Sequence, residues 1–326
     1  MNNLRRFKKA RDLGSSYLLT QINVDGSFGN VDLGLAEYYK VPAALHSSGH
    51  DRAASLLCDW IRKKGIQQNG DFGPRPTNLP DLWDYGYLYY NIWIVLGAQK
   101  LGYYDLSERG MNFLSTFWDY ISGGFYCHPS IHNEKTKQDL WVVAGCGIAA
   151  LATSRMKESI GVAKWMYNLM ELQPDYPDYL YSTYSRAEGL IIDPNIRYRM
   201  YRGANEDQFF FHPGIAGGFL ASIYMATNDR KWLDLSIKYM DFVDNASDFL
   251  FDLPRSGKVG WAASLLYTIT GVNKYKEIAL RVGDILIGLQ SDLGYWTDMD
   301  SSDPNNDVTA ELTYWLNEIH KSVGQD

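Results

Sequence analysis

The feature that most constrains the fold is an alternation of two kinds of helical segment along the chain. Apolar residues recur at a spacing of about 3.6 through most of it, which predicts helices. One kind of segment has a charged face: in 229–246, Trp232 and Tyr239 lie opposite Lys238. The other kind, such as LWVVAGCGIAALA at 140–152, is apolar nearly all round. A helix with one polar face lies outside a fold, whereas a helix that is apolar all round is enclosed.

Six segments of each kind alternate, so the sequence predicts an all-α fold, an (α/α)6 toroid with inner helices around a central cavity. No Pro/Ser-rich linker or charge block divides the chain, so we expect a single domain over residues 1–326. The outer helices are expected at 3–21, 50–65, 105–121, 157–172, 229–246 and 273–291, and the inner helices at 34–46, 84–101, 138–154, 212–227, 257–271 and 307–322.

The turns from outer to inner segments share a short motif. Gly26 follows an aspartate and Gly70 an asparagine, a phenylalanine comes two residues later, and the glycines are 70 − 26 = 44 residues apart. Related turns occur at 123–125 and 290–296. The glycine allows a positive φ, and the ring fills the gap between neighbouring helices. We expect a structural role, with the preceding glutamine capping the last carbonyls of the helix before it.

At these turns the sequence resembles the Gln–Trp repeats of squalene and oxidosqualene cyclases. Those enzymes belong to the terpenoid cyclase and protein prenyltransferase superfamily of α/α toroids. The segment PNNDVTAE at 304–311 is also similar to the D-x-D-D-T-A motif of class II terpene cyclases, whose middle acid protonates an alkene or epoxide. The resemblance implies that Asp307 is a proton donor, although Asn305 and Val308 replace the first and last acids of the motif.

Asp307 and Glu311 lie four residues apart, on one face of the expected last helix. Two carboxylates at this spacing repel each other when both are ionised, which favours keeping one of them protonated near neutral pH. A protonated acid is what cyclisation by general-acid catalysis needs. The alternative is that Asp307 only caps the helix.

Alternation of outer and inner helices brings all inner-helix N-termini to one end of the ring. The candidate catalytic residues there are Asp84, Asp139, His212, Lys258, Asp307 and Glu311, and the candidate substrate-binding rings are Tyr38, Trp83, Tyr85, Tyr87, Trp141, Trp261 and Tyr314. Aspartates at helix N-termini also serve as caps. Lys258 has no such explanation, so we expect it to face a carboxylate or an anionic ligand. His212 either faces the cavity or is a core histidine bonded to a backbone carbonyl.

The longest break between helices is at 173–211. Alternating residues on both sides of 193–195, Asp-Pro-Asn, predict a β-hairpin there. A loop of this length in a compact domain is usually a lid or a binding loop, which we expect to be mobile without ligand and to order when ligand binds. The alternative is a packed plug with a structural network of salt bridges.

Composition narrows the possible partners. The net charge of −7 argues against nucleic acid, and the apolar runs are too short or too interrupted to span a membrane. Three cysteines without paired spacing and no apolar signal sequence indicate the cytoplasm. Cys127, His128 and His132 are crowded into one loop, a poor arrangement for a zinc site. No nucleotide loop, haem motif or metal cluster is evident, so we expect no cofactor; the oligomeric state stays open.

Two functions on a small-molecule substrate stay open. The first is a cofactor-independent cyclase or isomerase of an apolar natural product, a terpenoid or polyketide, folded in a cavity whose aromatic rings support positive charge. The alternative is a carbohydrate-active toroid: a glycosidase, a lyase or a sugar epimerase. A glycosidase needs two carboxylates about 5–10 Å apart, whereas a cyclase of the terpenoid type needs one acid above an apolar pocket. The sequence does not separate them.

Overall fold

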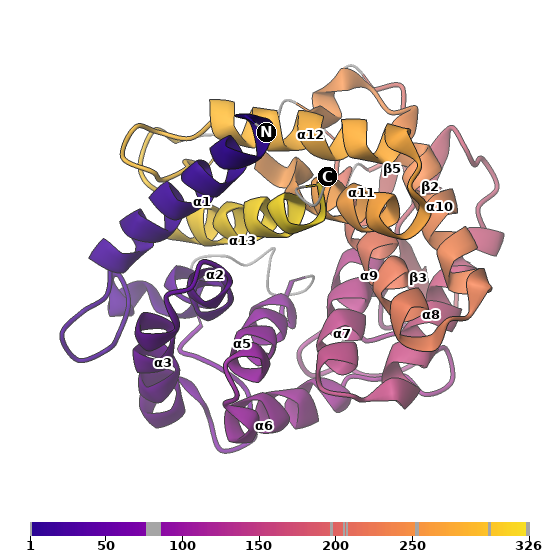
Figure 1. The fold of residues 1–326 in the computed structure, drawn as a ribbon. Helices are drawn as coiled ribbons and strands as arrows, with labels where there is room; N and C mark the ends of the chain where they lie inside the picture. The colour runs from indigo at the N-terminus through magenta and orange to yellow at the C-terminus, as the bar shows by residue number, and fades with distance from the viewer. Residues whose placement is uncertain are drawn as a thin grey trace.

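The computed structural model describes residues 2–75, 86–195, 198–204, 206, 208–251, 254–298 and 301–323. Within them inner and outer helices alternate along the chain in two concentric layers (Figure 1), which confirms the predicted all-α toroid. The inner helices are α2 (Val41–Ser47), α5 (Tyr89–Lys100), α7 (Leu140–Ala152), α9 (Phe211–Thr227), α11 (Gly257–Thr270) and α13 (Asn306–Val323). The outer helices are α1 (Asn2–Thr20), α3 (Asp51–Trp60), α6 (Tyr104–Ser115), α8 (Met156–Glu171), α10 (Arg230–Asp244) and α12 (Asn273–Gly288).

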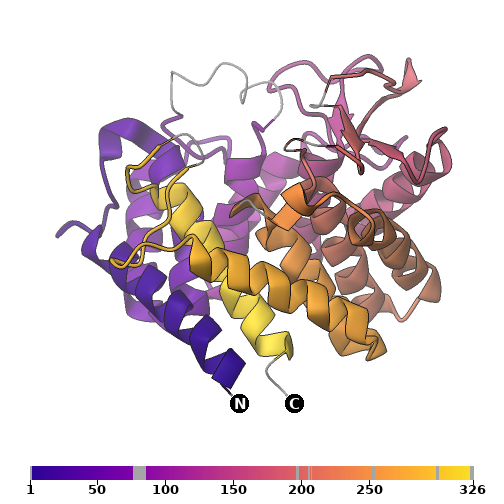
Figure 2. The same ribbon diagram turned by 90° about the horizontal axis from the view of Figure 1, so that it is seen from above.

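The inner helices close a ring. Each contacts the next along the chain, from α2 through α5, α7, α9 and α11 to α13, and α13 contacts α2. Each outer helix packs on an inner one, and α1 pairs with α13, so the two ends of the chain lie together (Figures 1 and 2). Contact between the first and the last helix thus closes the outer layer onto the ring.

Burial follows the two kinds of sequence segment. In α7 most residues are buried, on all sides of the helix, whereas α10 buries one face that includes Trp232, Tyr239 and Phe242. Small residues let inner helices approach closely: a Cβ added to Gly218 of α9 would lie 2.2 Å from the ring of Trp261 in α11. The enclosed layer is held by packing that larger side chains would prevent.

The repeated turns fold as expected at their glycines and rings. Their glycines have positive φ, and the ring that follows each is buried. The glycines are Gly26, Gly70, Gly123 and Gly294, with φ of 86°, 91°, 87° and 94°, and the rings are Phe28, Phe72, Phe125 and Trp296. The role given to the glutamine is wrong for Gln290, whose amide donates to the carbonyls of Ala10 in α1 and Gly294 in its own turn. It therefore ties neighbouring elements together.

Two inner helices begin later than expected. Before α2, a 3-10 turn η1 (Val31–Glu37) contains Gly34 at φ 72°. Helix α2 starts only at Val41, with Pro42 in its first turn. Proline favours the first turn of a helix, which explains this start. In α5 the helix starts at Tyr89; the expected start at residue 84 lies outside the described residues. Further short turns are η2 (Ile61–Gly65), η3 (Asp248–Phe251) and η4 (Pro254–Ser256).

The long break contains antiparallel strands as expected, but they form two small sheets and not one hairpin around residues 193–195. Strand β2 (Tyr179–Tyr181) pairs antiparallel with β5 (Arg199–Tyr201), on either side of the Asp-Pro-Asn turn. Between them, β3 (Thr183–Ser185) pairs with β4 (Gly189–Leu190) and with β1 (Gln138–Asp139), which directly precedes α7. Figure 2 shows these strands at the end of the ring away from the chain termini. The segment is thus tied to the start of an inner helix.

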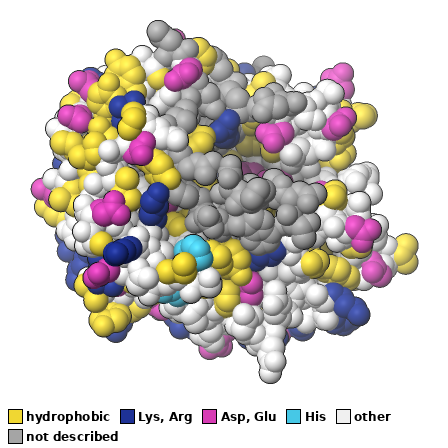
Figure 3. All heavy atoms as spheres, turned by 180° about the vertical axis from the view of Figure 1, so that it is seen from behind, with side chains coloured by type: hydrophobic (Ala, Val, Ile, Leu, Met, Phe, Trp, Pro, Cys, Tyr) yellow, Lys and Arg dark blue, Asp and Glu magenta, His cyan; other side chains and the backbone are white. Residues whose placement is uncertain are grey.

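None of the described helices is long and apolar enough to cross a membrane. On the face turned away from the viewer of Figure 1, described acidic and basic side chains are interspersed (Figure 3).

Candidate active site

A cavity of about 340 Å³ lies where the inner helices begin. Its walls come from the first residues of α5, α7, α9, α11 and α13 and from the residues before α2, so the expected gathering of N-termini is confirmed. Its aromatic wall consists of Tyr39, Tyr89, Tyr90, Trp141, Phe209 and Phe211. Its charged and polar groups are Lys40, His212, Arg255, Lys258, Asp298, Asn305, Asp307 and Glu311.

Four buried or half-buried charges form a chain along one side of the cavity. Lys40, just before α2, forms ion pairs with Asp307 at 2.6 Å and with Glu311. Glu311 also pairs with Lys258 of α11. Both lysines are about 4% exposed. The prediction that Lys258 faces a carboxylate is confirmed, and that carboxylate is Glu311.

The ion pairs fix the charge of this cluster. Burial alone would raise the pKa of Glu311, but attraction to Lys258 and Lys40 outweighs it and holds the pKa well below its usual range. Burial would lower the pKa of Lys40, but attraction to Asp307 and Glu311 raises it above its usual value, and Glu311 does the same for Lys258. Glu311 is therefore ionised. Lys40 pairs with both carboxylates, so the repulsion expected between Asp307 and Glu311 is neutralised by a cation between them.

On the other side of the cavity, a histidine is paired with a buried aspartate. Nε2 of His212, at the start of α9, lies 3.4 Å from Oδ1 of Asp139. Asp139 caps α7 by accepting the backbone N–H of Trp141 at 3.0 Å, and its Oδ2 accepts the hydroxyls of Ser182 at 3.1 Å and Thr183 at 3.2 Å. It lies behind His212 and does not line the cavity. The sequence predicts both residues but not their pairing.

Apart from Oδ1 of Asp307, which forms an ion pair with Lys40, three polar atoms of cavity-lining residues are buried without a hydrogen-bond partner in the described part of the chain. They are Nδ1 of His212, the hydroxyl of Tyr89 and Nε1 of Trp141. Because the Asp139 carboxylate faces Nε2 of His212, the proton of a neutral ring belongs on Nε2 and the lone pair on Nδ1. Buried polar atoms without partners are uncommon in folded proteins, so this wall is suited to a polar ligand.

Four of the predicted substrate-binding rings lie outside the cavity lining. Tyr38 donates its hydroxyl to the carbonyl of Gly73 at 2.8 Å, and Tyr87 donates to Asp71 at 2.7 Å. The other two pack between inner helices: Trp261 stacks on Trp315 with ring centroids 5.0 Å apart, and Tyr314 packs edge-on against Trp93 at 5.2 Å. Their rings serve packing because they lie on faces turned to neighbouring elements. Trp83, Asp84 and Tyr85 lie outside the described residues.

Sequence analysis missed Lys40 and the ring of Tyr89. Lys40 sits at the N-cap of α2, so the argument made for Lys258, a cation at the unfavourable end of a helix dipole, would have found it. Tyr89 and Tyr90 were missed because α5 was expected to begin five residues earlier, at 84 instead of 89. Phe209 and Phe211 stand beside His212 in the run FFFH, which drew attention only to its histidine.

Two arginines of the long break form ion pairs. Arg186 pairs with Asp119, outside the break, at 2.7 Å, and Arg202 pairs with Asp178, within the break, at 3.0 Å. These contacts favour the packed plug. The mobile lid stays an untested prediction. The described residues contain no group of three metal-ligating side chains. In the suspected zinc loop, Cys127 is buried and Nδ1 of His128 accepts the backbone N–H groups of Ser130 and Ile131.

Comparison with known proteins gives a fold and no family. No protein-family model matches the chain, and no curated protein matches it. Among solved structures it is similar to D-mannose isomerase, with a TM-score of 0.70, 13% identity and 97% of each chain covered. It is also similar to the GH76A α-1,6-mannanase of Salegentibacter sp. HEL1_6, with a TM-score of 0.66, 12% identity and coverage of 96% of this chain and 98% of that one. A third is an unsaturated glucuronyl hydrolase specific for heparin, with a TM-score of 0.61, 13% identity and coverage of 98% and 97%.

At these identities the likeness shows the α/α toroid fold alone. The toroid part of the resemblance drawn from the turns is therefore confirmed. The three structures just named are carbohydrate-active enzymes, so they lend no support to the terpenoid cyclase part of that resemblance.

Proposed function

We propose that this protein is a carbohydrate-active enzyme that isomerises or epimerises a sugar by moving a proton at a carbon next to a carbonyl group. The observation that carries the proposal is His212, whose Nε2 faces the buried Asp139 while its Nδ1 has no partner among the described residues of the cavity. An imidazole oriented by a carboxylate on one nitrogen acts as a general base through the other.

The reaction needs groups that this cavity contains. Nδ1 of His212 takes the proton from the carbon beside the carbonyl, and the electron pair of the broken C–H bond forms the double bond of an enediol. The ammonium of Lys258, which stays protonated beside Glu311, donates to the oxygen on which negative charge develops. The π pair of the carbonyl moves onto that oxygen, which takes the proton of the neighbouring hydroxyl while the proton held by His212 returns to the former carbonyl carbon. This gives the isomer, with the carbonyl moved by one carbon. Return of the proton to the other face of the starting carbon re-forms the original carbonyl and gives the epimer. No electrons leave or enter, so the step balances with substrate and protein alone.

Ion pairing of the cavity acids argues against a terpenoid cyclase. That chemistry needs a protonated acid above an apolar pocket, whereas Glu311 is ionised and Asp307 is paired with Lys40. A developing carbocation would also meet two buried ammonium groups in the same wall. Aromatic rings such as Tyr89 and Trp141 stack on sugar faces equally well, so the aromatic wall fits the carbohydrate interpretation without change.

A glycosidase is the second candidate, and the carboxylates make it weaker. Glycoside cleavage needs one protonated and one ionised carboxyl flanking the bond, but Lys40 binds both Asp307 and Glu311. A mannanase variant described as inactive carries substitutions at two adjacent aspartates. This chain has no two adjacent aspartates; in QDL, Gln138 stands before Asp139. Similarity to D-mannose isomerase supports an isomerase over a glycosidase.

Proton exchange with solvent tests the proposal. Reducing monosaccharides, both aldoses and ketoses, are incubated with the protein in D₂O and followed by ¹H NMR. We expect loss of the proton at the carbon beside the carbonyl for at least one sugar, together with appearance of its isomer or epimer. His212→Gln is the matched control and should abolish the exchange. Hydrolysis of an oligosaccharide without exchange in any monosaccharide would replace this proposal by the glycosidase.

A further inference from the structure

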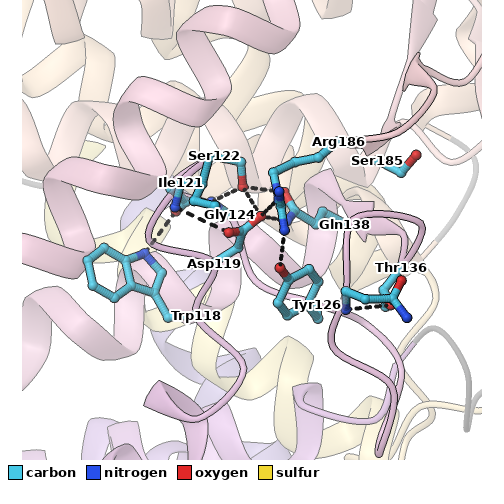
Figure 4. Close-up of polar contacts among 12 residues, drawn as sticks. Trp118, Asp119, Ile121, Ser122, Gly124, Tyr126, Thr136, Gln138, Ser185 and Arg186 are labelled. Atoms are coloured by element: carbon cyan, nitrogen blue, oxygen red, sulfur yellow. Dashed lines mark hydrogen bonds and ion pairs between the residues drawn. The ribbon is translucent and has the colours of Figure 1, made fainter.

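Asp119 is a buried carboxylate outside the cavity and has an unusual set of donors. It lies in the turn after α6, is about 2% exposed, and accepts three side-chain donors on Oδ2 (Figure 4). Ser122 donates its hydroxyl at 2.9 Å, Gln138 its amide at 3.0 Å and Arg186 its Nε at 2.7 Å. The backbone N–H of Ile121 donates to Oδ1 at 3.2 Å. One carboxylate thus joins a turn of the ring to two distant segments.

Two of these donors flank the residues that support His212. Gln138 directly precedes Asp139 in β1, and Arg186 directly follows β3. In the pairing of these strands, Asp139 stands opposite Thr183, whose hydroxyl donates to the Asp139 carboxylate. Asp119 therefore holds both strands of the short ladder that carries Asp139 and one of its hydroxyl donors.

We infer that Asp119 is a positioning residue for the proposed base: through Gln138 and Arg186 it sets the register and spacing of β1 and β3, and so aims the Asp139 carboxylate at Nε2 of His212. The inference rests on the proposed function for its catalytic consequence, but its geometric part is independent of the substrate. Strand β1 is only two residues long and β3 three. Such short strands have few ladder hydrogen bonds of their own, so side-chain anchors decide where they lie.

The negative charge of Asp119 strengthens its hydrogen bonds to these donors. Burial would raise the pKa of Asp119, but the hydrogen bonds from Ser122 and Ile121 and the attraction of Arg186 lower it below its usual value. Hydrogen bonds to an ionised acceptor are shorter and roughly twice as strong as neutral ones. Replacement by asparagine keeps the shape and removes the charge that binds Arg186.

Loss of a buried carboxylate also destabilises a fold in general, so the test needs a matched residue. Asp71 occupies the corresponding turn before α5 and is about 4% exposed. Its carboxylate accepts from Arg75, Tyr87 and Asn91, and none of these belongs to β1 or β3. Asp71→Asn is therefore expected to lower the melting temperature about as much as Asp119→Asn without touching the Asp139 ladder.

The experiment is ¹⁵N NMR of the histidine side chains in the full chain without ligand, with the His212 signals assigned by their loss in His212→Gln. In the wild type and in Asp71→Asn we expect neutral His212 as one tautomer, protonated on Nε2. In Asp119→Asn we expect a mixture of the two neutral tautomers. Arg186→Gln removes only one of the side chains bound to Asp119, so it should give a smaller change in the same direction. It replaces Asp119→Asn in the test if that variant does not fold. Turnover in Asp119→Asn should fall about tenfold or more with little change in KM, since misplacement of a catalytic group lowers rate rather than binding.

The outcomes separate this inference from the proposed function. An unchanged His212 tautomer in Asp119→Asn, or in Arg186→Gln if Asp119→Asn does not fold, would overturn the positioning role. Equal changes in Asp71→Asn would overturn it as well, because they would show general loosening. A His212 signal that responds as expected in a protein that exchanges no sugar proton would uphold the positioning and reject the isomerase.

Discussion

The two sides of the cavity differ in how their charged groups are partnered. On the side of α2, α11 and α13, Asp307, Lys40, Glu311 and Lys258 form a continuous chain of ion pairs, in which each charge meets an opposite one. On the side of α7 and α9, the Asp139 carboxylate supports one nitrogen of His212 and the other nitrogen has no partner among the described residues. A fully paired group holds its charge constant, whereas a group that exchanges protons needs an open atom. In the proposed function, this difference assigns the proton transfer to His212 and leaves the lysines as fixed donors.

The largest effect on stability is expected from breaking the ion-pair side. Glu311→Gln would leave two buried lysines without their shared carboxylate, which costs about 3–5 kcal/mol of unfolding free energy. Denaturant unfolding measures this loss. The surface pair of Arg62 and Asp105, at 2.7 Å and with side chains 39% and 57% exposed, provides the contrast. Asp105→Asn should cost about 1 kcal/mol or less, and equal losses in the two variants would show that the cluster contributes nothing special.

The largest effect on activity is expected from the His212 side. His212→Gln should lower turnover by about a hundredfold or more, the usual scale of general base catalysis. Its melting temperature should fall only modestly, because glutamine fills most of the space of the ring and Asp139 keeps its donors from Trp141, Ser182 and Thr183. Full turnover in a correctly folded His212→Gln protein would move the chemistry back to the opposite wall.

The pH dependence of stability distinguishes the two sides further. Glu311 has a lowered pKa in the fold, so its contribution to stability is present above its unfolded pKa and is lost as pH falls through the folded value. Lys40 and Lys258 have raised pKa values, so their contribution is present below their unfolded pKa and is lost as pH rises through the folded values. We expect the cluster to stabilise the fold fully from about pH 5 to about pH 10. Glu311→Gln lacks this carboxylate, so its free energy of unfolding should fall less between pH 7 and pH 3 than that of the wild type. Unfolding curves measured over this pH range give the difference.

A smaller effect is expected from the hydroxyl of Tyr89. Tyr89→Phe removes one hydrogen-bond donor from the polar wall, which should lower kcat/KM about three- to tenfold, the range of a single neutral hydrogen bond. Tyr314→Phe is the control, because that ring is buried between inner helices and lies outside the cavity lining. Steady-state kinetics of the two variants decide whether the Tyr89 hydroxyl contacts substrate.

The smallest effect is expected from Asp307, which the motif resemblance had marked as the proton donor. The structure does not place Asp307 as the cap of α13: it lies in the first turn, and Asn305 caps the helix by accepting the backbone N–H of Val308 at 3.0 Å. Asp307→Asn therefore leaves the cap in place and removes one of the two carboxylates of Lys40, so turnover should change by less than about tenfold. Single-turnover rates measure it. A loss of a hundredfold or more would restore Asp307 as a catalytic acid. It would also assign the chemistry to the ion-pair side of the cavity instead of the His212 side.

Sequence patterns predicted the ring because every helix repeats the same signal. Apolar periodicity separates inner from outer helices, and each turn glycine with its buried ring marks a joint. The site was harder, because its contacts join residues far apart in the chain. Lys40 and Glu311 are 271 positions apart, and no local pattern shows that a lysine will lie between two carboxylates that would otherwise repel. The local spacing of Asp307 and Glu311 suggested that they repel each other. The closed ring of helices brings Lys40 between them.

The pairing of His212 with Asp139 was likewise beyond local patterns. Each residue was marked by its place at an inner-helix N-terminus, and the fold brings these N-termini together. What sequence could not show is the small sheet that supports Asp139, because β1 and β3 are too short to leave an alternating pattern. The rings of Trp261 and Tyr314 were assigned to the cavity because they lie near inner-helix N-termini or are aromatic; neighbouring helices cover them instead.

A structure with a bound reducing sugar tests the central claim most directly. The account predicts the sugar stacked in the aromatic wall, with the carbon beside its carbonyl about 3–3.5 Å from Nδ1 of His212, a distance suited to proton transfer. Its carbonyl oxygen should lie within hydrogen-bond reach of the Lys258 ammonium. A sugar bound with its anomeric oxygen against Asp307 or Glu311, and with Nδ1 of His212 in contact with no carbon-bound proton, would contradict the account.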